Sequence, residues 1–140
     1  MLVKKLLFFL IHTLIASTTF ASTAYLGKTE IDGNVLLNKC DEAIKYIENR
    51  NAPHIDISAV NFCVGFISGV NEMHTAFVKS VTCFDPPVYC APISVSSEQL
   101  VKNVVNFLRA HPEDLHFHGS FLTLSALKKA YPCDYNTTPK

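Results

Sequence analysis

Residues 61–71 read Asn-Phe-Cys-Val-Gly-Phe-Ile-Ser-Gly-Val-Asn, without a single charge. In a helix built from this stretch, apolar residues lie on almost every side, which is typical of a buried central helix or a membrane span. The stretch is too short and too often interrupted by glycine for a span, which needs about 20 apolar residues. Gly65 and Gly69 share one helix face, and each costs about 1 kcal/mol relative to Ala. The pattern therefore predicts a central helix that accepts close neighbours and is stapled by a disulfide at Cys63.

The beginning of the chain reads as a secretory signal peptide. Lys4 and Lys5 precede a short apolar run, residues 6–16, and small residues follow up to Ala21. This is the order of a charged n-region, an apolar h-region and a cleavage site. We expect cleavage after Ala21, with Ala24 as the second choice. An uncleaved anchor is the competing interpretation, but the apolar run is short for a span.

The mature protein, residues 22–140, is long enough for one domain, whose core we place at about residues 34–133. The whole chain carries 12 basic and 12 acidic residues, and the loss of Lys4 and Lys5 leaves a net charge of about −2. This is not the basic footprint of a nucleic-acid-binding protein. The mature chain has no second apolar run that predicts stable insertion into a membrane.

Helical periodicity and end signals predict an all-α fold, a small bundle of about four helices. Asp32, Asp56 or Ser58, and Ser96 are candidate caps, and Ser96 with Gln99 forms a capping box. Prolines at 86, 87 and 92 predict a loop before the third helix. Pro112 is suited to the first position of a fourth helix. The helices are then expected to end near Asn49, near Ser80, near Ala110 and just before Pro132.

All five cysteines, Cys40, Cys63, Cys83, Cys90 and Cys133, lie after the predicted cleavage site. In an oxidising compartment they predict disulfides, and an odd number leaves one thiol over. A zinc site needs closer spacing than that of Cys83 and Cys90, so we expect no metal. Sequence alone does not fix the connectivity. The topology of two antiparallel helical hairpins favours Cys40–Cys63 and Cys90–Cys133, with Cys83 left over.

A search for catalytic chemistry finds little. His111, His116 and His118 cluster beside Glu113, but a di-iron site needs a second Glu-x-x-His copy and further glutamates. Cys63 stands in an apolar setting, which favours a structural disulfide over a nucleophile. The sequence contains no Gly-rich phosphate loop and no Gly-x-Ser-x-Gly elbow. We therefore predict no catalytic residue and no cofactor, and expect a binding protein rather than an enzyme.

Several short motifs, each present once, follow one another along nearly all of the mature chain. They are Phe62 to Val70, Tyr89 to Pro92, Val95-Ser96 with Gln99, Val104 to Leu108, His111 to Glu113, Ala126-Leu127 and Ala130 to Cys133. In order and spacing they resemble the Rap/Tai immunity-protein family. The resemblance implies a small periplasmic all-α protein that binds a toxin and blocks its active site. It implies a type VI secretion effector as the toxin, notably a peptidoglycan amidase. Some members form homodimers.

The chain departs from this family pattern at Cys83 and in the following stretch, residues 84–88. Loops often carry binding residues, and aromatic anchors commonly dominate the energy of an interface. We therefore predict Phe84, Asp85 and Tyr89 as partner-binding residues. The alternative is that Phe84 and Tyr89 only cover helix ends. The competing function is a periplasmic helical binding or chaperone-like protein without a cognate toxin.

The signal peptide gives the first testable prediction. Protein purified from the periplasm should begin at Ser22, because the signal peptidase is expected to cut after Ala21. Intact-mass spectrometry and N-terminal sequencing check this. A purified chain that still begins at Met1 would contradict it.

Overall fold

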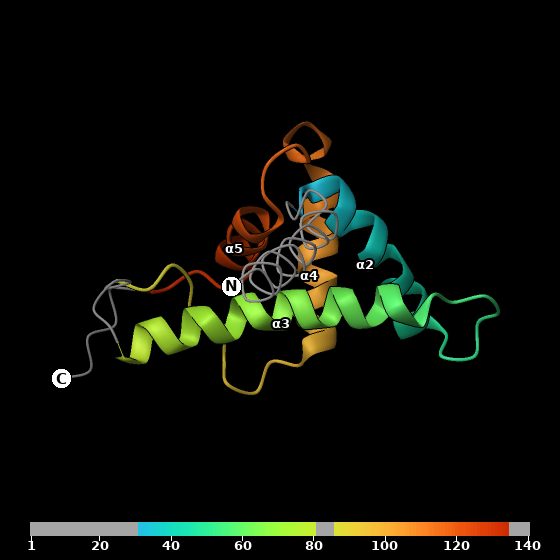
Figure 1. The fold of residues 1–140 in the computed structure, drawn as a ribbon. Helices are drawn as coiled ribbons and strands as arrows, with labels where there is room; N and C mark the ends of the chain where they lie inside the picture. Colours follow the sequence, from blue (N-terminus) through green and yellow to red (C-terminus); the bar gives the residue numbers. More distant parts are fainter. Residues whose placement is uncertain (1–30, 81–85, 135–140) are drawn as a thin grey trace, which may run out of the picture. The chain divides into compact units, whose positions relative to one another are not determined.

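The computed structural model describes residues 31–80 and 86–134. They form α2 (Gly33–Glu48), α3 (Ile57–Ser80), α4 (Ser97–Ala110) and α5 (Gly119–Ala130), with a short 3₁₀ turn, η2 (Pro112–Asp114), before α5. Within these ranges the one β-type pairing is an isolated bridge between Asp32 and His118. The predicted all-α fold of about four helices is therefore confirmed (Figure 1). The proposed signal peptide and Cys83 lie outside the described residues.

Side-chain caps begin three of the helices where the sequence predicts them. Asp32, Asp56 and Ser96 each accept the backbone N–H of the residue three places on, at 2.9, 3.1 and 3.2 Å. Such a cap satisfies one of the amides that a helix start leaves without an intrahelical partner. The predicted capping box is only half formed. The Gln99 side chain donates to Asn103 Oδ1 at 3.2 Å instead of returning to the cap.

The fourth helix begins later than predicted, which is a correction to the sequence analysis. Pro112 opens only the 3₁₀ turn, and α5 begins at Gly119. The carbonyls of Leu115 and Phe117 accept the backbone N–H groups of Asn34 and Gly33 at 3.2 and 3.0 Å. They thereby satisfy the open amides of the α2 N-terminus, so they are not free to start a helix of their own. A tertiary contact thus overrides a good local helix signal.

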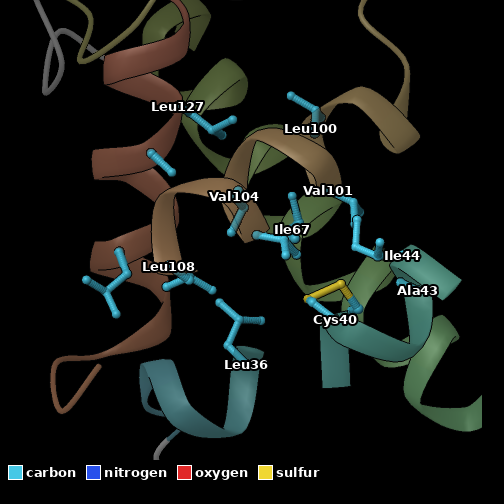
Figure 2. Close-up of a cluster of buried hydrophobic side chains, with 14 of the residues drawn as sticks. Leu36, Cys40, Ala43, Ile44, Ile67, Leu100, Val101, Val104, Leu108 and Leu127 are labelled. Atoms are coloured by element: carbon cyan, nitrogen blue, oxygen red, sulfur yellow. A yellow bond between two sulfur atoms is a disulfide. The ribbon is translucent and has the colours of Figure 1, made fainter. Parts of the chain in front are cut away.

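The buried residues of all four helices meet in one core around a disulfide. Cys40 on α2 is bonded to Cys63 on α3, and both are fully buried. Figure 2 shows this bond among side chains that converge from the four helices. A second disulfide joins Cys90 to Cys133. Both predicted disulfides are therefore confirmed. The larger fully buried side chains are Leu36, Ile67, Val101, Val104, Val105, Leu108, Leu122 and Leu127.

The two glycines of α3 do not have the neighbours that the sequence analysis expects. Gly65 and Gly69 are exposed, and a Cβ built on either would meet nothing within 4 Å among the described residues. The prediction of a close backbone contact there is wrong. Although α3 is apolar on most sides, no described residue packs against it at these two glycines. None of the described helices is long and apolar enough to cross a membrane.

The close approach occurs at Gly33 instead. A Cβ there would lie 2.8 Å from Leu115 Cα, 2.9 Å from Leu115 O and 2.5 Å from Leu122 Cδ1. The first two contacts are with backbone, which cannot turn away as a side chain can. A glycine at position 33 is therefore what allows the start of α2 to lie against the segment before α5.

Two alanine substitutions should have opposite effects on stability. Gly33→Ala should lower the free energy of unfolding by about 1–3 kcal/mol, because the added methyl group overpacks a tight contact. Gly65→Ala should raise it by about 1 kcal/mol, because alanine favours the helix and meets no obstacle. Urea unfolding followed by circular dichroism measures both changes. Equal destabilisation by the two variants would contradict this account of where the backbone is crowded.

Candidate partner-binding site

The segment that leads into α4, residues 86–96, is called the strap here. In Figure 1 it is the yellow and gold trace that passes α3 before α4 begins. The Cys90–Cys133 disulfide ties its middle to the residues that follow α5. Beside this bond, the Cys90 N–H donates to the Tyr131 carbonyl at 2.9 Å. The strap is thus an irregular segment that is held firmly at its centre.

Tyr89 anchors the strap to α3. Only 2% of the residue is exposed. Its ring stacks on that of His74, with centroids 3.9 Å apart, and its hydroxyl donates to Asn71 Oδ1 at 3.0 Å. Burial lowers the pKa of His74. Burial, together with the Glu72 carboxylate, raises the pKa of Tyr89 to about 12. Both rings are therefore neutral at pH 7.

This burial corrects one of the predicted partner-binding residues. Tyr89 faces the interior, so in this conformation its ring is not presented to a partner. The alternative interpretation, in which the tyrosine covers a helix, describes its position. Phe84 and Asp85 lie outside the described residues, and their role in binding stays a prediction.

Ile93 is a large apolar strap residue that faces solvent, and its exposure was not predicted from the sequence. The Val95 N–H donates to the Pro92 carbonyl at 3.0 Å, which closes a four-residue turn. Ile93 occupies the second position of this turn and is 100% exposed. A signal for it existed. Ile93 is a large apolar residue between a proline and a helix cap, outside the apolar stripe of every predicted helix.

A groove of about 490 Å³ runs between the strap and the C-terminal half of α3. Its volume lies in the range of ligand and side-chain pockets. One wall combines hydroxyl, amide and charged groups of α3, and the other is mainly apolar. The hydroxyls of Ser68 and Ser97 meet across it at 3.4 Å. It is lined by Ser68, Asn71, Glu72, His74, Thr75, Val78 and Lys79 of α3, by Pro87, Tyr89, Cys90, Ala91, Pro92, Ile93 and Val95 of the strap, and by Ser97 and Leu100 of α4.

The histidine cluster near η2 is occupied with backbone contacts. His111 Nδ1 lies 2.7 Å from the Phe107 carbonyl, and His116 Nδ1 lies 2.9 Å from the Glu113 carbonyl. Within residues 31–80 and 86–134, no group of three His, Cys, Asp or Glu side chains is placed to hold a metal ion. The groove beside the strap is therefore the better candidate for a functional site.

A family model described as Rap1a immunity proteins matches residues 32–133. The chain belongs to the Rap1a immunity protein family. No curated protein and no solved structure matches it significantly. The matched region runs from the cap of α2 to the last cysteine, and it includes both disulfides and the whole strap.

In this Rap1a family member the two disulfides differ in solvent access. Cys40 and Cys63 are fully buried in the core. Cys90 is exposed and Cys133 is half-buried. A thiolate must reach a sulfur atom directly to open a disulfide. The strap disulfide is therefore within reach of a reductant while the core disulfide is not.

Mild reduction should open the strap before the core. After free thiols are blocked, a low concentration of dithiothreitol followed by an alkylating agent should label Cys90 and Cys133 first. Peptide mapping identifies the labelled residues, and circular dichroism of the same samples should show retained helix. Labelling of Cys40 and Cys63 at an equal or faster rate would contradict the difference in access.

Proposed function

We propose that the protein is a periplasmic immunity protein that binds and inhibits a toxic effector through its strap. Membership of the Rap1a immunity family supports the class of activity. The observation that carries the proposed surface is Ile93, which is fully exposed on a segment fixed by a disulfide and a buried tyrosine. An exposed aliphatic side chain contributes favourable free energy to binding when a partner buries it. A segment ordered in advance loses little entropy on binding.

The proposal extends to the effector and the compartment. The resemblance to Rap/Tai proteins favours a peptidoglycan hydrolase, an amidase delivered by a type VI secretion system. Such an enzyme acts on the cell wall, so its inhibitor has to meet it in the periplasm. Two disulfides suit that oxidising compartment. The protein acts by occupying the effector, without chemistry of its own.

The chaperone-like alternative differs from this proposal in its breadth of binding. An immunity protein captures one partner through one surface, whereas a chaperone-like protein captures many unfolded clients. The homodimer that the resemblance implies for some members stays a prediction, which light scattering of the mature protein tests.

The proposal is tested by replacing the exposed anchor. Ile93→Asp should weaken effector binding about tenfold or more, because a charge replaces an apolar side chain at the contact. Mature wild-type protein and the variant are used to capture proteins from lysates of competing strains. The captured protein is then expressed in the periplasm, alone and with each form. Cells that express the captured protein by itself should lyse. Cells that also express the wild type should be protected, and cells that express the variant in its place should lose this protection.

Ile57→Asp serves as the matched control. Ile57 is also an exposed isoleucine, but it begins α3, at least about 16 Å along the helix from the groove. It should protect as wild type does, and both variants should unfold at the temperature of the wild type. Full protection by Ile93→Asp would move the interface away from the strap. Capture of many unrelated proteins would favour the chaperone-like function.

A further inference from the structure

Of the described residues that line the groove, two carry a formal charge, Glu72 and Lys79. They are seven residues apart on α3, which separates them by about 10 Å along the helix axis. The neighbouring His74 and Tyr89 are both neutral at pH 7, for the reasons given above. Among the described residues, the end of the groove at Glu72 therefore presents one negative charge without a cation beside it.

Glu72 also forms no ion pair with another described residue. The ion pairs among the described residues are Glu42 with Lys45, Glu98 with Arg50 and Asp41 with Arg109. Glu72 takes part in none of them, although it is exposed at the edge of the groove. As far as the described residues go, its carboxylate is thus open to a group that comes from outside.

The strap side of the groove is suited to an alkyl chain. Pro92, Ile93 and Val95 of the strap line it. Lysine and arginine bury their apolar stems along such surfaces while the charged head reaches a polar partner. A carboxylate from α3 and apolar side chains from the strap, lining the same groove, are the two parts of a site for a basic side chain.

We propose that the Glu72 end of the groove receives a basic side chain, arginine or lysine, from the protein that binds the strap. Ile93 supplies the apolar contact, and Glu72 selects for positive charge. This inference rests on the proposed function, since it describes the chemistry of the effector surface that meets the strap. An effector with an acidic or apolar group at that position binds less well.

The site is tested first without the effector. The probe is the peptide acetyl-Gly-Arg-Gly-amide, and its control is the same peptide with citrulline, which has nearly the same shape but no charge. In two-dimensional NMR of the mature protein, the arginine peptide should shift amides of residues 68–79 and 88–96 saturably at millimolar concentration. The citrulline peptide should not. Equal shifts from both peptides, or none from either, would overturn the proposal.

Variants then assign the charge to one residue. Glu72→Gln should weaken binding of the arginine peptide roughly fivefold, as expected for a partly exposed ion pair. Glu48→Gln, at an exposed position at the end of α2, should leave it unchanged. If Glu72→Gln binds the peptide as wild type does, the proposal is wrong.

The two proposals can fail separately. If the peptide does not bind but Ile93 is still needed for protection, the charge selection falls and the immunity function stands. If the peptide binds at Glu72 but no toxic effector is captured, the groove is a site for basic side chains and the immunity function falls. With an effector in hand, Glu72→Gln should also reduce the salt dependence of its affinity.

Discussion

The fold depends on the buried covalent bond between Cys40 and Cys63. It holds the two longest described helices together at a Cα–Cα distance of 5.0 Å, in the middle of the core. Closing a loop of 23 residues lowers the entropy of the unfolded chain, which stabilises the folded state by roughly 3 kcal/mol. With α2 and α3 fixed side by side, Leu36 and Ile67 present a joint apolar surface. The stripe of α4 packs there, and α5 covers α4 (Figure 2).

The sequence predicts those parts of this arrangement that local chemistry decides. Asp32 and Ser96 form caps within three residues of themselves, so a short window contains all the information. The start of α5 depends instead on hydrogen bonds between Leu115, Phe117 and the distant N-terminus of α2. The glycines show the same difference. Gly33 is crowded by residues far along the chain, while the conspicuous pair in α3 is exposed.

The sequence predicts where the strap lies, but it does not predict which strap residues face inward and which face solvent. Prolines and Cys90 mark the strap as an irregular, tethered loop. Periodicity separates inward from outward positions in a helix, and an irregular segment has no such period. Aromatic content therefore points to Tyr89, whose apolar ring and polar hydroxyl suit it equally to burial with a hydrogen-bond partner. The large apolar residue that faces solvent is Ile93, because it lies in the turn between Pro92 and the cap at Ser96 and does not reach the core.

In the proposed function, stability and recognition are consequently carried by different residues. The core disulfide and the apolar stripes fix the helices, while Cys90, Cys133 and Tyr89 fix only the strap. Ile93 and the Glu72 carboxylate belong to neither set, since one is fully exposed and the other forms no ion pair among the described residues. Replacing them changes what the surface attracts without removing a buried contact. A fold built in this way lets its partner preference change by single substitutions, at little cost to the free energy of unfolding.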